Sequence, residues 1–393
     1  MRKTLVINSG SSSLKFKLFT MPNFDVDCEG IIDRIGIDKS SIKVEFGDDE
    51  VKKETEIKNH EQGIALLLEI LEENNLISNK EEITKVGHRV VQGGEVFKES
   101  SLIDDEKLES IYDLARLAPL HNVPNADGIK VFKKLLPHAQ NVAVFDTEFH
   151  QTMPATSYMY AVPYTWYKEH NVRRYGMHGT SHKFIANKVA EFENNKNLKI
   201  INCHLGNGAS LCAIESGKCI QTSMGLTPLA GIMMGTRSGD IDPSILEYIS
   251  KQTGKNLEEI TSILNKESGM LGLSQISSDF RDVEAEYLAG NEMAIMAFDV
   301  YITRIVETIG SYFMRLGGVD VISFTGGIGE NSDLVRSKVI EGISALGIKV
   351  DSEINGNRKL AKNNVVSTKD SKVKAWVITT DEEYQIALEA EKF

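Results

Sequence analysis

The sequence predicts an α/β protein built from two related halves. Its 393 residues exceed what one hydrophobic core usually serves, so two domains are expected. Segments typical of strands alternate with segments typical of helices, which indicates an α/β architecture. One local pattern also occurs twice, about half the chain apart: an apolar strand, an asparagine, a tight Gly/Ser turn and a second strand. This repetition predicts a duplicated fold that grips one polyphosphate with both halves.

The two copies of the pattern are easily located. In the first, Leu5–Ile7 leads through Asn8 into the turn Ser9–Ser13 and the strand Leu14–Leu18. In the second, Ile200 and Ile201 precede the matching asparagine, and the turn and second strand follow at 203–214. Turns rich in Gly and Ser let backbone N–H groups approach an anion, because these residues carry little bulk.

Between and after these copies, the apolar spacing predicts further elements. Ile64, Leu67, Leu68 and Leu71 fall at helical spacing, and so do Leu108, Ile111 and Leu114 after a candidate cap at Asp104. We expect Pro124 to open a helix that Pro137 ends, and the strand Val142–Phe145 to run directly into Asp146. Later elements are listed in order: a long buried helix at Asn291–Arg315 ended by Gly317, a strand at Val319–Phe324, a third glycine turn at Thr325–Asn331, a strand at Val373–Ile378 and a last helix near Asp381.

Composition excludes several classes of protein. With 41% hydrophobic and 25% charged residues the chain is ordinary globular material. A net charge of −12 argues against nucleic acid as the main partner but not against a small anion. The apolar run at the start is too short for a signal peptide, and no segment approaches a membrane span, so we expect a cytoplasmic protein without a membrane partner. The four cysteines form no C-x-x-C pair, which favours buried free thiols over a zinc site.

Each glycine-rich turn has an ordinary interpretation and a functional one. The first turn could be a plain hairpin, but Asn8 and Lys15 beside it favour phosphate or metal binding. The turn at His204–Ser210 has the same ambiguity. The third, at Gly326–Gly329, follows a strand and precedes a helix, where α/β folds bind nucleotides. Neither GxxxxGK[ST] nor GxGxxG occurs, so a P-loop is excluded and a dinucleotide fold is disfavoured.

Five polar residues in apolar or glycine-rich surroundings suggest an anionic site. Arg89 could cover a core edge or face a carboxylate. Arg237, in a loop of small residues, could be an inert surface group, and His178, between two glycines, could be structural. Asp146 and Glu382 stand where carboxylates bind Mg²⁺, although helix capping explains Glu382 equally well.

A series of segments, taken in order, resembles the acetate kinases, the acetokinase family of short-chain acyl kinases, over essentially the whole chain. The matching segments are 8–15, 87–91, 118–122, 145–147, 174–182, 204–208, 225–240, 279–281, 326–331 and 380–383. The resemblance implies the two-domain, duplicated, actin/sugar-kinase-like (ribonuclease H-like) fold. It also implies an N-terminal domain at 1–149 for the acyl substrate, with the helix 383–393 packed back on it, and a C-terminal domain at 150–382 for the nucleotide and for dimerisation.

The resemblance further implies a role for each matched residue. Metal binding falls to Asn8 and Glu382, with Mg²⁺ or Mn²⁺ as the ion. Catalysis falls to Asp146, His178 and Arg237. The substrate site comprises Arg89 and the apolar walls Val91, Leu120 and Pro228. Nucleotide contacts fall to Lys15, His204, Leu205, Gly206, Asn207, Gly208, Asp279, Phe280, Arg281, Gly327, Ile328, Gly329, Glu330 and Asn331.

The implied reaction is ATP plus acetate giving acetyl phosphate plus ADP, reversibly, in a homodimer whose domains close over both substrates. Because acetate is already a carboxylate near pH 7, Asp146 is expected to orient the metal or its waters instead of acting as a base. Met177 leaves the choice between acetate and propionate open. The other readings are a general short-chain acyl kinase, an actin-like or chaperone-type ATPase, and a sugar kinase.

Overall fold

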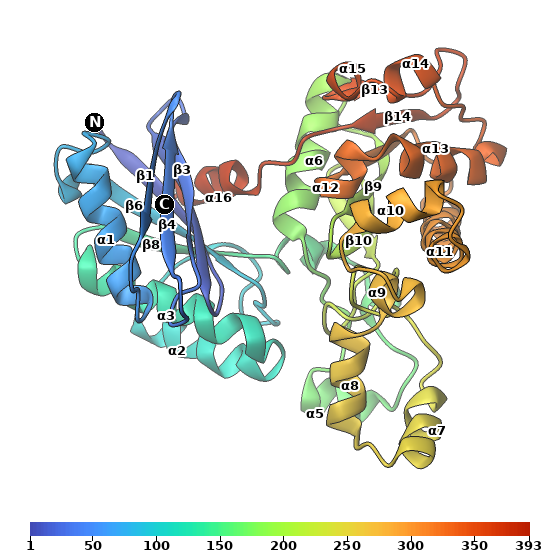
Figure 1. Cartoon of the computed structure of the whole chain (residues 1–393), viewed down its shortest axis with the longest axis horizontal. Coiled ribbons are helices and arrows are strands. Elements are labelled where there is room, and N and C mark those ends of the chain that lie inside the picture. Colours follow the sequence, from blue (N-terminus) through green and yellow to red (C-terminus); the bar gives the residue numbers. More distant parts are fainter. The chain divides into compact units, whose positions relative to one another are not determined.

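The computed structural model describes the backbone of residues 1–393 and every side chain except that of Leu120. It divides into two compact units, residues 1–149 with 381–393, and residues 150–380. Each unit is built on its own β-sheet (Figure 1). Among the described residues, no helix combines the length and apolarity needed to cross a membrane.

The first unit contains an eight-stranded sheet in the order β5-β4-β3-β2-β1-β6-β8-β7. Its strands are β1 (Lys3–Ser9), β2 (Ser13–Thr20), β3 (Asp25–Asp33), β4 (Ser41–Phe46), β5 (Asp49–Glu54), β6 (Ile83–Val90), β7 (Ser101–Leu102) and β8 (Gln140–Phe145). Its helices are α1 (His60–Glu73), η1 (Lys80–Glu82), α2 (Asp105–Asp113), η2 (Leu114–Arg116), α3 (Pro119–Leu135) and α16 (Glu382–Ala390).

The second unit contains a six-stranded sheet in the order β11-β10-β9-β12-β14-β13. Its strands are β9 (Lys199–Leu205), β10 (Ala209–Glu215), β11 (Lys218–Thr222), β12 (Val321–Thr325), β13 (Asn364–Val365) and β14 (Lys374–Val377). Its helices are η3, which starts in the first unit (Phe149–Thr152), α4 (Ala155–Tyr158), α5 (Tyr164–His170), α6 (Gly179–Phe192), α7 (Ser244–Thr253), α8 (Leu257–Lys266), α9 (Gly269–Ser274), α10 (Phe280–Leu288), α11 (Glu292–Leu316), α12 (Gly326–Asn331), α13 (Asp333–Gly342), η4 (Ser344–Leu346), α14 (Ser352–Asn355) and α15 (Arg358–Ala361).

The two sheets repeat one topology. In the first, β3, β2 and β1 form an antiparallel meander, and β6 and β8 follow parallel to β1. In the second, β11, β10 and β9 form the meander, and β12 and β14 follow parallel to β9. A short antiparallel strand ends each series, β7 beside β8 and β13 beside β14. The predicted duplicated, ribonuclease H-like α/β fold is therefore confirmed.

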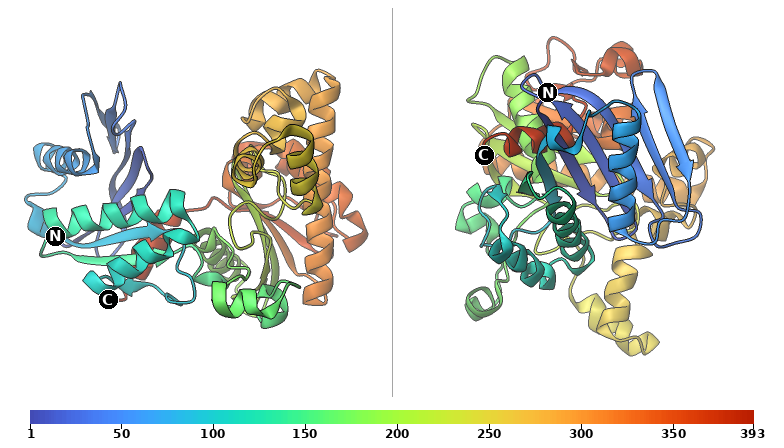
Figure 2. Two further views of the ribbon diagram at one scale, coloured as in Figure 1. Left: turned by 90° about the horizontal axis from the view of Figure 1, so that it is seen from below. Right: turned by 90° about the vertical axis from the view of Figure 1, so that its left-hand side faces the viewer.

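Alternation along β1 assigns its side chains to two cores. Leu5 and Ile7 face a core shared with α1 and the end of α3, whereas Val6 faces a second core shared with α16. Figure 2 shows α1 and α3 over one face of this sheet. Ile386 of α16 would lie 2.9 Å from a Cβ at Gly87 of β6, so only glycine admits the helix this closely. The C-terminal helix is thus an integral part of the first unit.

Three predicted elements need correction. Pro124 lies inside α3, which begins at Pro119, because Asn122 and Asn125 hydrogen-bond to neighbouring segments and hold this first part helical. The glycine segment after β12 is a short helix, α12, and not a turn. Its first residue, Gly326, has φ +79° and would place a Cβ 2.7 Å from the Leu205 carbonyl oxygen, so glycine is required there.

The third correction concerns the long helix α11, which was expected to be buried. One face packs on the second unit through residues such as Phe298, Ile305 and Ile309. The other face exposes Met293, Met296 and Met314. Gly317, in the left-handed region, ends the helix as predicted, and Asn291 caps its N-terminus.

Candidate functional site

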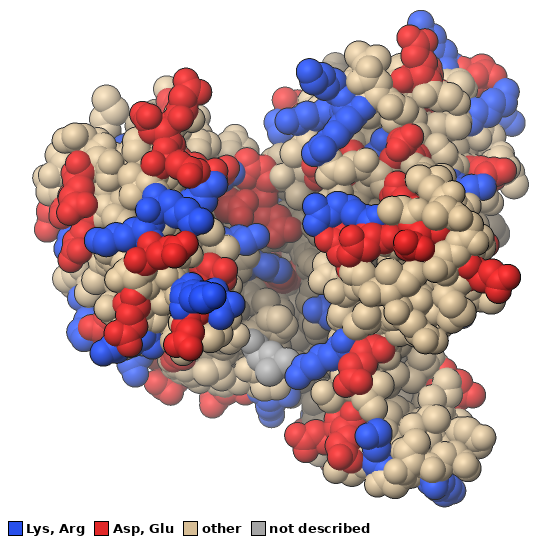
Figure 3. Space-filling view, in the orientation of Figure 1, with Lys and Arg blue, Asp and Glu red and all other residues tan. Residues whose placement is uncertain are grey.

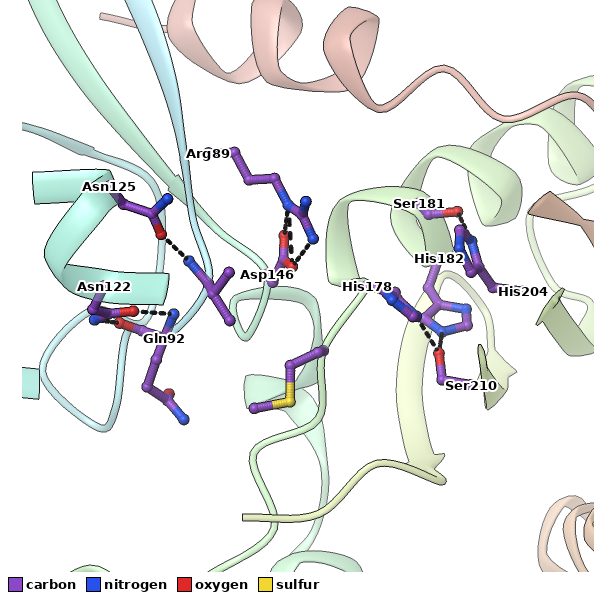
Figure 4. A network of polar contacts seen from close by, with 12 residues as sticks. Arg89, Gln92, Asn122, Asn125, Asp146, His178, Ser181, His182, His204 and Ser210 are labelled. Carbon is purple, nitrogen blue, oxygen red and sulfur yellow. Dashed lines mark hydrogen bonds and ion pairs between the residues drawn. The ribbon is translucent and has the colours of Figure 1, made fainter. Parts of the chain in front are cut away.

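A buried ion pair stands at the carboxyl edge of the first sheet. β6 and β8 are parallel neighbours, so Arg89, near the end of β6, meets Asp146, which directly follows β8. Arg89 Nε donates to Asp146 Oδ1 at 3.0 Å and Nη2 donates to Oδ2 at 2.6 Å (Figure 4). The Asp146 side chain is 1% exposed and that of Arg89 20%. This fork fixes the guanidinium plane and leaves Nη1 for a second anion.

Carboxylates of α16 lie close enough to interact with this pair. Burial raises the pKa of Glu382, the attraction of Arg89 and Lys15 lowers it, and the repulsion of Asp146 adds to the rise. Lys15 is paired with Asn8 across β1 and β2. An amide oxygen at Asn8 and a carboxylate at Glu382 are the hard ligands that Mg²⁺ and Mn²⁺ prefer, and a cation would relieve the cost of charge on Glu382. The residues therefore fit a divalent metal.

Two asparagines of α3 hold the segments beside the pair. The Val91 N–H donates to Asn125 Oδ1 at 3.1 Å, and the Asn125 amide donates to the Ser9 carbonyl at 2.7 Å. The Gln92 N–H donates to Asn122 Oδ1 at 3.0 Å (Figure 4). Sequence reasoning missed both asparagines, although Asn122 ends a segment that matched the family. Val91 is buried, and the Leu120 side chain lies outside the described residues.

His178, in the second unit, is held by a chain of buried polar side chains. It is the N-cap of α6 and has φ +61°, in the left-handed region. Its Nδ1 lies 2.9 Å from Ser210 Oγ, and His182 Nε2 lies 2.8 Å from the same oxygen (Figure 4). His182 Nδ1 contacts the amide nitrogen of Asn202 at 2.8 Å, and Ser323 Oγ donates to Asn202 Oδ1 at 2.8 Å.

These contacts assign the protons along the chain. The Asn202 amide donates to His182 Nδ1, so His182 is neutral and its Nε2–H donates to Ser210. Burial lowers the pKa of His182, and the nearby His150 and His204 lower it further. Ser210 is fully buried, so its hydroxyl hydrogen is left to point at His178 Nδ1. His178 is then neutral with its proton on Nε2. An N–H donor at this position needs no positive charge.

Arg237 lies near the same nitrogen. A Cβ at Gly208 would lie 3.4 Å from Arg237 Nη1 and 3.6 Å from His178 Nε2, so both groups border this glycine. Nη1 also donates to the carbonyl of Pro228 at 3.4 Å. Burial lowers the pKa of Arg237, and no described carboxylate forms an ion pair with it. A half-buried cation without a counter-ion, next to an N–H donor, is suited to an anion such as phosphate.

A cavity of about 870 Å³ opens in the second unit, and three predicted nucleotide-binding segments line it. They contribute Gly206 and Asn207, Asp279–Arg281, and Gly327, Ile328 and Asn331. Arg281 donates to Asp279 through Nε and Nη2, and these bonds lower the pKa of Asp279 to about 2. The size suits a nucleotide.

Other predicted nucleotide residues do not line this cavity. His204 and Leu205 end β9, where His204 Nδ1 bonds Ser181 Oγ at 2.8 Å. Glu330 accepts hydrogen bonds from the N–H groups of Gly326 and Thr380. Lys15 belongs to the first unit, as do the predicted metal, substrate and catalytic residues Asn8, Arg89, Val91, Asp146 and Glu382.

Several lining residues were missed by sequence reasoning: Met234, Gly235, Met270, Ser278, Glu284, Ala285, Leu288, Tyr301, Ser332 and Arg358. Three of them, Glu284, Ala285 and Leu288, fall on one face of α10, and helical spacing after Asp279 could have indicated them. The Tyr301 hydroxyl is buried and has no hydrogen-bond partner among the described residues.

Arg336 hydrogen-bonds to the carboxyl end of the short helix α12. Its side chain is fully buried on α13, and Nη1 donates to the carbonyls of Gly329 and Glu330 at 2.9 and 3.0 Å. Nε donates to Asn355 Oδ1 at 2.7 Å. Burial lowers the pKa of Arg336 to about 10. A cation at the carboxyl end of a helix satisfies carbonyls that have no partner in the helix.

Charge is mixed over the surface. On the face drawn in Figure 3, acidic and basic side chains alternate over each unit. Many pair locally, as Lys349 does with Asp370 and Lys374 with Glu193.

Comparison with known proteins gives a consistent result. A sequence profile described as the acetokinase family matches residues 3–388. The acetate kinase of Macrococcus caseolyticus is 46% identical over 395 residues, covering 100% of this chain and 99% of that protein. The acetate kinase of Anoxybacillus flavithermus is 49% identical over 389 residues, covering 98% of each.

Solved structures agree. The Porphyromonas gingivalis acetate kinase superposes with a TM-score of 0.94 at 42% identity and covers 100% of this chain and 99% of its own. A propionate kinase from Francisella tularensis gives a TM-score of 0.94 at 39% identity and covers 100% of both chains.

Proposed function

This chain belongs to the acetokinase family, and from that premise we propose that it transfers the γ-phosphoryl group of ATP directly and reversibly to acetate. Membership makes it a kinase that phosphorylates a carboxylate, with ATP as substrate and a divalent metal. The choice of a small carboxylate as acceptor rests on Arg89. Asp146 holds the Nε and Nη2 atoms of its guanidinium, so Nη1 is available to bind a second carboxylate.

In this proposal Arg89 holds the acetate carboxylate. The acceptor and the γ-phosphate are both anions, and a fixed guanidinium offsets their repulsion while aligning the attacking oxygen. Acetate needs no general base, because it is already ionised near pH 7. Asp146 accepts hydrogen bonds from both Nε and Nη2 of Arg89, so we assign it to holding that guanidinium, in addition to the metal-orienting role expected from sequence. Val91, Leu120 and Pro228 are proposed as the apolar walls.

The second unit supplies the nucleotide site and positive charge. Phosphoryl transfer passes through a loose transition state with negative charge on the equatorial oxygens. Arg237 and the Nε2–H of His178 border one glycine and are proposed to stabilise that charge. The cavity of about 870 Å³ is proposed to hold the adenosine, with Asp279–Arg281 and residues 327–331 around it. Lys15 and residues 204–208 are proposed as phosphate contacts.

Asn8 and Glu382 are proposed to hold Mg²⁺, with Mn²⁺ as a substitute. The metal, when bound, neutralises charge on the phosphates. Both donors are oxygens, and burial disfavours the charge that Glu382 carries.

We also propose a homodimer and a cytoplasmic location. Met293, Met296 and Met314 support the homodimer, because all three are exposed on one face of α11 that has no partner in the described chain. Light scattering of Met296→Glu tests it, since a monomer is expected. Four buried free thiols are consistent with a reducing compartment.

Trapping of acetyl phosphate by hydroxylamine tests the function. With ATP, Mg²⁺ and acetate, we expect hydroxamate to form in proportion to ADP. ADP that forms without hydroxamate, and without need of acetate, would contradict a kinase with a carboxylate acceptor.

Propionate is the second candidate acceptor, supported by the likeness to the propionate kinase of Francisella tularensis. Steady-state kcat/KM for acetate, propionate and butyrate decides between them. A higher kcat/KM for propionate would assign that substrate instead.

A further inference from the structure

Three buried side chains that the proposed reaction does not use converge in the second unit. His150, Cys212 and Cys219 place a ring nitrogen and two sulfurs within 4.8 Å of one another. Cys212 Sγ lies 3.5 Å from Cys219 Sγ, and Cys219 Sγ lies 3.2 Å from His150 Nδ1. Both cysteines are 0% exposed and the histidine 1%. The spacing of the cysteines in the sequence did not predict this cluster, because Cys212 and Cys219 approach each other only through the hairpin β10–β11.

The histidine is oriented as a ligand. Its Nε2 lies 2.9 Å from the Met177 carbonyl oxygen, which only accepts. The Nε2 therefore carries the proton, and Nδ1 turns its lone pair toward the sulfur of Cys219. A ring N–H held by a main-chain carbonyl is the usual outer support of a metal-binding histidine.

The donor set also fits one kind of ion. Two thiolates and a neutral imidazole balance a divalent cation, so the loaded site has no net charge, as a buried position requires. Thiolate sulfur selects soft or borderline ions, whereas Mg²⁺ keeps to oxygen.

We propose that His150, Cys212 and Cys219 form a site for one Zn²⁺ ion. Binding replaces the two thiol protons, which are released to solvent, and the imidazole binds through Nδ1. A zinc ion with three protein ligands keeps one position for water.

The position of the site gives it a structural role. His150 is the first residue of the second unit, and Thr152, two residues later, donates to the Cys219 carbonyl at 2.9 Å. Met177, which holds the His150 ring, directly precedes His178. The ion would therefore fasten the start of this unit and the His178 segment to the hairpin β10–β11.

Cobalt titration of the full-length protein, reduced and in the presence of Mg²⁺, tests the proposal. Co²⁺ is expected to bind once per chain, to give a sulfur-to-cobalt charge-transfer band and to be displaced by Zn²⁺. Cys212→Ala and Cys219→Ala should each weaken binding by more than the roughly 10–100-fold that loss of an outer-shell partner costs. Cys28→Ala is the matched control, since Cys28 is also buried but lies in the first unit, and it should bind as wild type does.

Circular dichroism checks that each variant folds. Zinc anomalous scattering from crystals of the wild type locates the ion without any substitution. A spectrum without the sulfur band, a band that survives both substitutions, or an ion located elsewhere would overturn the proposal.

Discussion

The two sheets share their strand order but differ in the chemistry at their carboxyl edges. In the first unit, charged groups meet there: the Arg89–Asp146 pair and, within electrostatic range, Glu382 and Lys15. In the second unit, the buried chain from Ser323 to His178 is neutral, and a glycine helix follows β12. The same scaffold therefore serves two purposes. In our proposal the paired charges suit one small anion, whereas the neutral donors, the open backbone and the single cation Arg237 suit a large polyphosphate.

Arg237→Gln tests the second edge most severely. It removes the cation beside His178, so kcat should fall about 10²–10³-fold, the usual cost of losing one preorganised transition-state contact. The KM for ATP should change little. Steady-state kinetics measure both. Arg281→Gln, at the exposed end of the cavity, is the matched control and should act mainly on the KM for ATP.

Asp146→Asn tests the first edge. It leaves Arg89 without its counter-charge, and we expect kcat to fall about 100-fold, the lower end of that range. Because no base is proposed, the acidic limb of the pH–kcat profile should keep its position. A limb that moves with the substitution would restore Asp146 as a proton acceptor.

Arg89→Lys separates charge from geometry at the same pair. Lysine keeps the charge but loses the planar fork, so the KM for acetate should rise about 10–100-fold, equivalent to one charge-assisted hydrogen bond. The KM for ATP should rise far less. Equal losses for both substrates would show that Arg89 does not hold the acceptor.

His88 is a buried, neutral histidine that directly precedes Arg89, a member of the charged pair of the first unit. Burial lowers its pKa to about 4, although the hydrogen bond to Asn141 opposes this. Between its ordinary value of 6.5 and pH 4, the unfolded chain binds a proton here that the folded chain does not. Stability is therefore lost as the pH falls through this window, by about 2 kcal/mol between pH 7 and pH 5.

Urea unfolding at these two pH values measures this loss. His88→Gln should remove its part of the acid sensitivity, and His138→Gln, at a partly exposed position, should not. An unchanged slope in His88→Gln would assign the sensitivity to other groups.

Ser210→Ala makes the smallest change. It removes the hydroxyl that assigns the His178 tautomer, and kcat should fall about tenfold, the cost of about one hydrogen bond. Nitrogen NMR of the His178 imidazole reports its tautomer directly. A merely structural role of Ser210 would leave that tautomer unchanged. The signal of the Nε2–H tautomer should dominate in wild type and mix with the Nδ1–H form in the variant. Ser210→Thr should restore the wild-type spectrum if it folds.

Sequence reasoning succeeded where the signal is local. The repeated strand–turn–strand pattern predicted β1–β2 and β9–β10, and the predicted cap at Asp104 is confirmed. The last helix begins near Asp381 as expected, but Asp381 caps it and not Glu382. Arg89 and Asp146 each stand at a strand end, and the parallel pairing of β6 and β8 is what brings them together.

It failed where partners are distant in the chain. Nothing local reveals that Asn202, His182 and Ser210 form one hydrogen-bonded chain, because each lies on a different element. The thiols were expected to be buried and free, and they are, but their meeting with His150 depends on a hairpin and on the start of the second unit. Tertiary packing also overrode the expectation that Pro124 would begin a helix.

The return of residues 381–393 to the first unit bears on how the protein is made. Val6 and Val142 pack with Ile386 and Ala390, which are synthesised after the whole of the second unit. During synthesis, all residues of the second unit (150–380) are therefore present before the first unit is complete. Part of one apolar face of the N-terminal sheet therefore stays uncovered until residues 381–393 have been synthesised, and a nascent-chain chaperone would matter most in that interval.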